Sequence, residues 1–394
     1  MRGRKGLVAL AALFLLPAAE PAPDYAGDAR ALDALIAENY AYIDRFAGAK
    51  LPDSSLLAAE RDAVRDAKSL LAYAERRIAS LADHHAITGA SFADSWAIVP
   101  TYADLWVVAD DGAYRIDAVR ADSPAEKAGI RRGDVLVAVE GVPTAQAVAD
   151  FWAGLGLDVA GDDRDGYAAR VLAAGRRDRE RRLTLSRGHD KARTVTLPNL
   201  YAVEKPESAP VAVSMEGADV TAIRVNNALG DDRTIEAFDA AMASLPADAR
   251  VVIDLRDTPS GGNSMVARAV MGWFVDRPTP YQMHSLPVEE GSSGIARQWI
   301  ELVLPRAGKH RAKPVAVRVG RWTGSMGEGI AIGFASMGVP VCGDRMAGLR
   351  GAIYDFDLPS SKMRFKIPVE RLFAVNGQPR EDFRPVPDQD CPVR

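Results

Sequence analysis

Short apolar runs alternate with stretches of helical periodicity over the second half of the chain. The runs expected to be strands cover 220–225, 251–255 and 315–319, and the expected helices cover 234–245, 264–274 and the stretch that starts at Ser325. Short continuous apolar runs between turn residues are typical of buried strands. Because strand and helix alternate, crossover connections are expected, and the pattern predicts an α/β domain over 201–394 with a largely parallel sheet.

The first part of the chain keeps helical spacing. Apolar residues recur at intervals of three and four from Leu32 to Ile43, and a second run extends from Leu56 to Ile78. Ser54 or Ser55 is the expected cap of the second run. The pattern predicts a helical N-terminal unit over 24–88.

The region between these two parts shows strand-like alternation. Residues 114–119 alternate, 122–130 read as a short capped helix that ends in glycine, and 133–141 read as turn, strand and turn. In that order, the string Ser-Pro-Ala…Ala-Gly-Ile…Gly-Asp…Leu…Val…Gly resembles a PDZ domain. The resemblance implies a PDZ-like, β-rich domain over 102–200. The glycine-rich loop that holds a peptide carboxylate is not recognisable in 105–112, so the sequence does not predict conventional tail binding.

Composition narrows the class of protein. The 394 residues are 48% hydrophobic and 26% charged, and the net charge is −4. These values are ordinary for a globular protein of two or three domains and give no reason to expect nucleic-acid binding. No Cys/His cluster has zinc-ligand spacing, so we expect no metal.

The start of the chain resembles a targeting segment. Three positive residues within the first five precede an apolar run over 6–16, and small residues follow at 17–19. This order predicts a signal peptide over 1–19, and an uncleaved anchor is the alternative. We therefore expect an exported protein, periplasmic or secreted, with no other membrane segment. An oxidising compartment permits a disulfide between Cys342 and Cys391, but their spacing cannot prove one.

Ser325 stands where a buried strand turns into an apolar helix. The preceding strand covers 315–319 and the apolar run covers 330–335. Such a junction exposes a side-chain oxygen beside free backbone N–H groups, which is how nucleophilic serines are often presented. The alternative is that Ser325 only caps the helix.

Gly261 and Gly262 follow the strand 251–255 closely. Paired glycines let the backbone approach a ligand and direct N–H groups at it, as in half of an oxyanion hole. A tight turn that merely needs glycine is the alternative.

Together, the Asp-Leu-Arg…Gly-Gly stretch and the small-Ser-x-x-Glu segment at Ser325 resemble the tail-specific, or C-terminal-processing, serine proteases. A PDZ domain before the catalytic domain is also that family's arrangement. The resemblance implies a ClpP/crotonase-like catalytic domain, a protein or peptide substrate and no cofactor.

The better-known branch of that family uses a lysine base in a Gly-Lys-Gly motif. Here residues 348–351 read Gly-Leu-Arg-Gly. Arginine has a pKa above about 12 and cannot act as a base near neutral pH. Lys362 and Lys366 come later and are weaker candidates for the role.

The chain resembles more closely the tricorn-protease core branch, in which a histidine before the PDZ domain serves as base. The segment 81–86 aligns His85 with that base, and 381–388 aligns Glu381 with the supporting carboxylate. His84 takes the place of a serine, and is a candidate accessory group or the base itself. Arg384 stands where glycine is usual. Alternatively, the histidines cap a helix and Glu381 is a surface carboxylate.

These observations give one hypothesis for an exported serine peptidase. The expected catalytic residues are Ser325, His85 and Glu381, and the expected oxyanion donors are the N–H of Met326 and that of Gly261 or Gly262. A peptide-binding scaffold with weak or no turnover is the second hypothesis, and hydrolysis of a non-peptide ester is a third.

Overall fold

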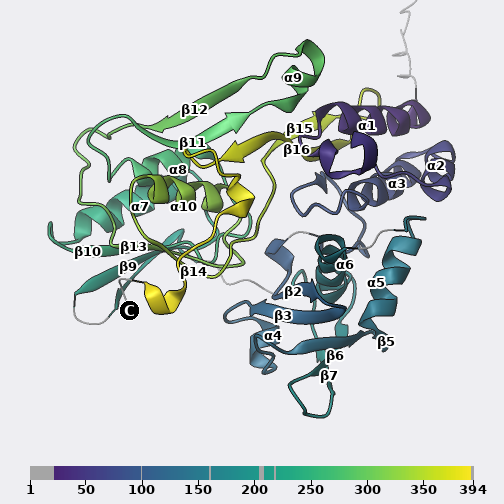
Figure 1. Ribbon diagram of the computed structural model, residues 1–394, viewed down its shortest axis with the longest axis horizontal. Coiled ribbons are helices and arrows are strands. Elements are labelled where there is room, and N and C mark those ends of the chain that lie inside the picture. Colours follow the sequence, from purple (N-terminus) through teal and green to yellow (C-terminus); the bar gives the residue numbers. More distant parts are fainter. Residues whose placement is uncertain (1–21, 99, 159–160, 204–207, 217–218, 392–394) are drawn as a thin grey trace, which may run out of the picture.

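A computed structural model describes residues 22–98, 100–158, 161–203, 208–216 and 219–391. The expected signal peptide over 1–19 lies outside these residues. Within them, no helix is long and apolar enough to cross a membrane. The chain folds into mixed helix and sheet, as the hydrophobic pattern predicts (Figure 1).

The N-terminal unit is helical, as expected. It contains α1 (Tyr25–Asn39), α2 (Ser55–Asp62) and α3 (Ala67–Ala79), with 3₁₀ turns at Ile43–Arg45 and Ala47–Ala49. Ser54 caps α2 by accepting a hydrogen bond from the N–H of Leu57 at 3.0 Å. The second predicted run is two helices, because Asp66 starts α3 by accepting from the N–H of Ser69 at 2.7 Å.

The PDZ-like region is an antiparallel sheet with three helices. Its elements are β2 (Leu105–Asp110), β3 (Ala113–Val119), α4 (Pro124–Lys127), β4 (Val135–Val139), β5 (Val142–Pro143), α5 (Thr144–Ala153), α6 (Asp162–Ala174), β6 (Arg181–Ser186) and β7 (Arg193–Leu197), preceded by a 3₁₀ turn at Pro100–Tyr102. The strand order is β2-β3-β4-β6-β7, with β5 paired to β4. Among the described residues, the edge strand β2 therefore pairs with a strand on one side only.

The predicted parallel sheet is present. Its strands are β8 (Val211–Glu216), β9 (Val220–Val225), β10 (Arg250–Asp254), β13 (Ala316–Val319) and β14 (Val341–Gly343), in the order β14-β13-β10-β9-β8. All pairs are parallel except that of the edge strand β8. The helices are α7 (Arg233–Ser244), α8 (Ser264–Met271) and α10 (Met326–Ser336). The second is shorter than the 264–274 expected from the sequence.

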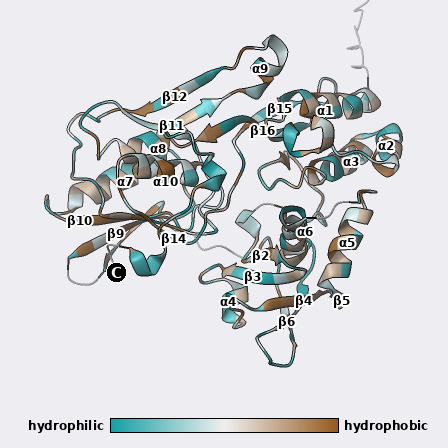
Figure 2. Ribbon diagram, viewed as in Figure 1, coloured by the Kyte–Doolittle hydropathy of each residue, from teal (hydrophilic) through white to brown (hydrophobic). Residues whose placement is uncertain are grey.

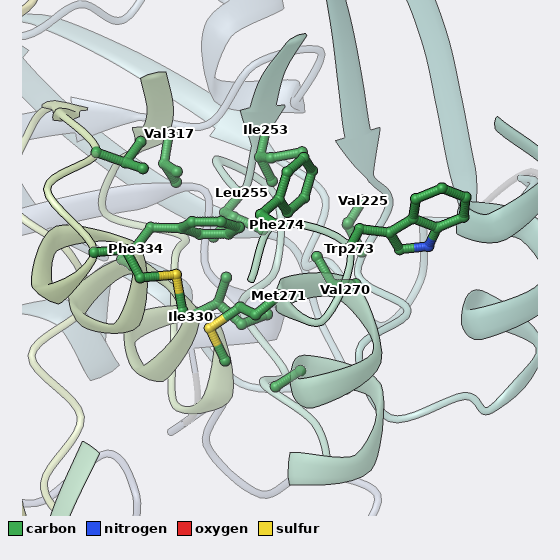
Figure 3. Close-up of a cluster of buried hydrophobic side chains, with 14 of the residues drawn as sticks. Val225, Ile253, Leu255, Val270, Met271, Trp273, Phe274, Val317, Ile330 and Phe334 are labelled. Atoms are coloured by element: carbon green, nitrogen blue, oxygen red, sulfur yellow. The ribbon is translucent and has the colours of Figure 1, made fainter. Parts of the chain in front are cut away.

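Hydrophobic residues run along the strands of this sheet (Figure 2). Ile253 and Val317 of the sheet are buried with Met271 of α8 and with Ile330 and Phe334 of α10 (Figure 3). This core fixes the start of α10 at the carboxyl ends of β10 and β13, where ligands of such sheets gather.

A second, antiparallel sheet was not expected. It contains β1 (Ile87–Thr88), β11 (Thr279–Ser285), β12 (Gln298–Val303), β15 (Ala352–Asp357) and β16 (Arg364–Phe373), with α9 (Pro287–Ser293) between β11 and β12. Strand β16 pairs with β1 and with β11. Its residues Phe365 and Ile367 are buried in the core of the helical unit, so the last part of the chain completes the packing of the first.

The C-terminal segment lies against the parallel sheet. The N–H of Val386 donates to the carbonyl of Val341 at 2.8 Å. Cys342 and Cys391 form a disulfide, with Cα atoms 5.7 Å apart. The short 3₁₀ turn Asp388–Asp390 is thereby held beside β14, and the turn Arg380–Asp382 lies against α10 (Met326–Ser336).

Candidate active site

Ser325 occupies a strained backbone position immediately before α10. Its φ is 51° and its ψ is −112°, in a region that residues with a side chain rarely adopt. Strain of this kind at a strand–helix junction is found where a nucleophile is held above a sheet. The side chain is half-buried.

The two glycines lie directly against this junction. A Cβ on Gly261, whose φ is +62°, would stand 2.4 Å from the Cβ of Ser325. A Cβ on Gly262 would stand 2.1 Å from the carbonyl of Leu229. Glycine is therefore required at both positions, because any side chain would clash with the backbone or with the serine.

The candidate oxyanion donors differ in availability. The N–H of Gly261 donates to the carbonyl of Thr258 at 3.1 Å. In the part of the chain that the structure describes, the N–H groups of Gly262 and Met326 have no acceptor. Gly262 is exposed, so this pair is better placed than Gly261 to bind a ligand oxygen.

Glu328 lies in the first turn of α10 and is completely buried. Its carboxylate accepts hydrogen bonds from the N–H of Ser325 at 2.8 Å, of Gly348 at 2.8 Å and of Leu349 at 3.2 Å. Burial raises the pKa of Glu328 to about 7, against the charge of Arg380 and the three N–H groups. The carboxylate joins the serine junction to the loop 348–351.

That loop is where a lysine base stands in the better-known protease branch. The side chain of Arg350 points to α6 and donates to Asp163 at 2.9 Å. Lys362 donates to the carbonyl of Pro359 at 2.7 Å, and Lys366 pairs with Asp355 at 3.1 Å. Both lysines bond groups around β15 and β16, and among the described residues neither bonds Ser325.

His85 is buried and bonded to the same loop. Its Nδ1 lies 2.6 Å from the carbonyl oxygen of Arg350. A carbonyl only accepts, so Nδ1 carries the proton and Nε2 keeps its lone pair. Burial lowers the pKa of His85 to about 4, although the bond to Arg350 opposes this shift. The side chain is therefore neutral at pH 7 and able to accept a proton at Nε2.

His84 is engaged at both ring nitrogens. Its Nδ1 bonds the carbonyl of Ile98, and Arg170 of α6 donates to its Nε2 at 2.8 Å. Burial is the main reason that its pKa falls to about 3. The ring also packs against Tyr167 in a tilted arrangement, with ring centres 4.5 Å apart. His84 has no free lone pair for a base and supports the local structure.

Glu381 lies in the 3₁₀ turn Arg380–Asp382, and its role in orienting His85 stays a prediction. The Arg350 carbonyl occupies Nδ1 of His85, and the described residues include no hydrogen bond from His85 to Glu381. The buried Oε2 of Glu381 has no hydrogen-bond partner among the described residues. Glu381 instead lines a chamber of about 60 Å³ together with Glu328.

The structure brings Ser325, Gly261, Gly262 and Met326 together at one junction. In the described ranges, no hydrogen bond joins Ser325 to His85 or to Glu381. His85 reaches the serine indirectly, through the loop 348–351 and Glu328.

Sequence reasoning missed three groups. The carbonyl of Arg350 leaves no trace in a sequence, because every residue has one. Buried Arg380 donates to the carbonyls of Leu349 and Gly351, both at 2.8 Å. Asp83 accepts from the N–H of His85 at 2.9 Å. Among these three groups, the sequence signal that could have drawn attention was the position of Arg380 next to the candidate Glu381.

Comparisons with known proteins agree with this architecture. Residues 115–151 match the family model of a PDZ domain. The photosystem II D1 C-terminal processing protease is 18% identical, with 92% of this chain and 93% of that chain covered and a TM-score of 0.56. Mature CPAF is 15% identical, with 92% of each chain covered and a TM-score of 0.57. No curated protein sequence matches. The two structures show the fold, which is that of the C-terminal-processing proteases with a PDZ domain.

Proposed function

We propose that this chain, folded as the C-terminal-processing proteases are, is an exported serine peptidase that acts through an acyl-enzyme. One observation carries the proposal: the strained Ser325 lies against Gly261 and beside the N–H groups of Gly262 and Met326, which have no acceptor among the described residues. A serine that only capped a helix would need neither this backbone conformation nor the two glycines.

In this proposal, Nε2 of His85 takes the proton of the Ser325 hydroxyl while its oxygen attacks the peptide carbonyl. The N–H groups of Gly262 and Met326 bind the resulting oxyanion. His85 then gives its proton to the leaving amine, which departs and leaves an acyl-serine. Water, deprotonated by the same histidine, releases the acid and regenerates the serine. The hydrogen bond between the Ser325 hydroxyl and Nε2 of His85 forms in the complex with substrate, as catalytic hydrogen bonds often do.

The neighbouring domain supports a role in access to the site. A peptide joins a PDZ domain as an extra strand along a free sheet edge. Here Arg170 of α6 donates to the carbonyl of Val107 on the edge strand β2 at 3.0 Å. Because α6 packs along that strand, we propose that the PDZ-like domain shapes the path of a protein or peptide substrate and does not capture its tail by strand addition.

Export is part of the proposal. The expected signal peptide over 1–19 motivates it, and the Cys342–Cys391 disulfide is what an oxidising compartment would permit.

A fluorophosphonate probe tests the nucleophile, because covalent labelling needs an activated hydroxyl. We expect labelling at Ser325 and hydrolysis of casein, and both should disappear in Ser325→Ala. Ser336→Ala, at the other end of α10, is the matched control and should keep both. A wild-type protein that is neither labelled nor active is a peptide-binding scaffold. Labelling with ester hydrolysis but no peptide hydrolysis would support an esterase.

A further inference from the structure

We propose that the main-chain carbonyl of Arg350 orients His85 in place of a carboxylate, and that buried Glu328 and Arg380 are the positioning residues that hold this carbonyl. The inference deepens the proposed function and rests on it for its catalytic meaning. Its structural part, the tautomer of His85, can be tested without any turnover.

The main-chain N–H groups and the carbonyls of the loop 348–351 bond to side chains of opposite charge. The carboxylate of Glu328 accepts from the N–H groups of Gly348 and Leu349, at 2.8 and 3.2 Å. The guanidinium of Arg380 donates to the carbonyls of Leu349 and Gly351, each at 2.8 Å. One carbonyl between them, that of Arg350, is left for His85.

The backbone of this loop has little room to move. Gly351 has a φ of +55°, and a Cβ there would stand 2.0 Å from the carbonyl oxygen of Glu370 on β16. Glu328 and Arg380 are both at most 1% exposed. Anchored by these two buried side chains and by the close approach at Gly351, the loop can therefore fix the direction of the Arg350 carbonyl.

A carboxylate in a triad fixes the tautomer of the histidine and stabilises the imidazolium, and a carbonyl in this position performs the first role fully. It fixes the Nδ1–H tautomer, which leaves Nε2 free to accept the serine proton. It carries no negative charge, so it stabilises the imidazolium less than a carboxylate would. This agrees with the low pKa of His85, which burial dominates.

Glu328 also couples the histidine to the nucleophile. The same carboxylate that holds Gly348 and Leu349 accepts the N–H of Ser325 at 2.8 Å. Its removal would loosen the strained serine and the loop together. A displacement of about 1 Å in a reacting group can reduce a rate by about 10²-fold.

The test uses the full-length protein labelled with ¹⁵N-histidine, with Glu328→Gln, Arg380→Lys and Glu381→Gln compared. In the wild type, the His85 resonance, assigned from its loss in His85→Ala, should show a protonated Nδ1 and an unprotonated Nε2 at pH 7. Glu328→Gln and Arg380→Lys should disturb this pattern, and Glu381→Gln should keep it. Glu75→Gln is the matched control, since that half-buried carboxylate of α3 bonds Ser95 elsewhere in the molecule.

In turnover, Glu328→Gln should lower kcat about 10²-fold with little change in KM, and Glu381→Gln should lower it less. Should Glu328→Gln fail to fold, the wild-type tautomer and Arg380→Lys still decide the matter. A protonated Nε2 in the wild type, or a loss of the tautomer in Glu381→Gln alone, would overturn the proposal. A correct tautomer in a protein that neither binds the fluorophosphonate nor cleaves peptides would instead overturn the proposed function and leave the positioning intact.

Discussion

Two buried histidines in this molecule, His85 and His284, have opposite surroundings. His85 bonds the neutral carbonyl of Arg350, and its pKa falls to about 4. His284 on β11 lies 2.6 Å from the carboxylate of Glu370 and 3.3 Å from that of Glu301. Burial alone would lower the pKa of His284, but the two carboxylates outweigh it and raise the pKa.

The difference shows that the hydrogen-bond partners of a buried histidine determine the direction of its pKa shift and whether it can accept a proton. His284 has a carboxylate near each ring nitrogen, which favours its protonated form and raises its pKa, and it stacks on Trp299 with ring centres 4.8 Å apart. A cation has no lone pair to accept a proton. His85 has one nitrogen occupied by an acceptor and the other free, which is the state a general base requires. A histidine–glutamate pair is therefore no sufficient sign of a catalytic base in this fold.

The largest expected effect separates His85 from its neighbour His84 by turnover. His85→Ala should reduce kcat by about as much as Ser325→Ala, several orders of magnitude, because the members of such a site act as a unit. His84→Ala should reduce it less, since both of its ring nitrogens serve structure. The exposed His310→Ala is the control. Peptide hydrolysis measured at pH 7 decides this, and a fully active His85→Ala would remove the histidine mechanism.

The disulfide should matter more to the His85 region than to the His284 region. It closes a loop of 49 residues that carries Arg380 and Glu381, and such a crosslink is worth about 4 kcal/mol in the chain-entropy model. Cys391→Ser should therefore lower the free energy of unfolding and raise amide exchange in 348–351 more than in β11 and β12. Uniform exchange in both regions would contradict this. Intact mass under non-reducing conditions first checks that the bond forms.

The dependence of kcat on pH near neutrality should reflect the ionisation of Glu328, because the pKa of Glu328 lies above that of His85. Protonated Glu328 would direct an O–H at N–H groups, which are donors themselves, so the loop needs the carboxylate. Since the pKa of Glu328 is raised to about 7 and that of His85 is lowered to about 4, kcat should rise with pH through a limb near 7. The charged groups facing Glu328 in its chamber are Arg321, Arg345, Arg380, Glu381 and Arg384.

Glu328→Gln cannot ionise, so its limb should move down toward pH 4, where His85 gains a proton. The control is Glu75→Gln, which should keep the wild-type limb. A limb near 7 that survives in Glu328→Gln would show that a different group titrates there.

Much of this fold could be predicted from the sequence because its signals are local. The expected strand 220–225 coincides with β9, and the PDZ-like order of strand, short helix and strand is present. The antiparallel sheet was missed because its pairs join distant segments, as when β16 pairs with β1. Periodicity within one segment does not reveal which partner it will meet.

The candidate site, like the fold, could be predicted from the sequence only in part. Residue types suggested Ser325, the two glycines and the two histidines. The strained φ of Ser325 and the choice between His84 and His85 depend on contacts made in the folded chain. The Arg350 carbonyl could not be singled out, since main-chain groups are common to all residues.

The smallest expected effect is a pair of opposite slopes in stability against pH. The pKa values of His84 and His85 lie below the ordinary value of about 6.5, so between those values the unfolded chain binds more protons and stability rises with pH. The raised pKa of His284 acts in reverse, because its contribution is complete below pH 6.5 and is lost as pH rises through the folded value. Urea unfolding at pH 5, 6.5 and 8 measures both slopes.

Relative to wild type, His85→Gln should gain stability at pH 5, by at most about 1.4 kcal/mol for each pH unit below 6.5. His284→Gln should show its greatest deficit at low pH and its smallest at pH 8. The same sign of slope in both variants would mean that the pKa values of the two histidines do not shift in opposite directions, and the comparison between the carbonyl-bonded His85 and the carboxylate-bonded His284 would fail.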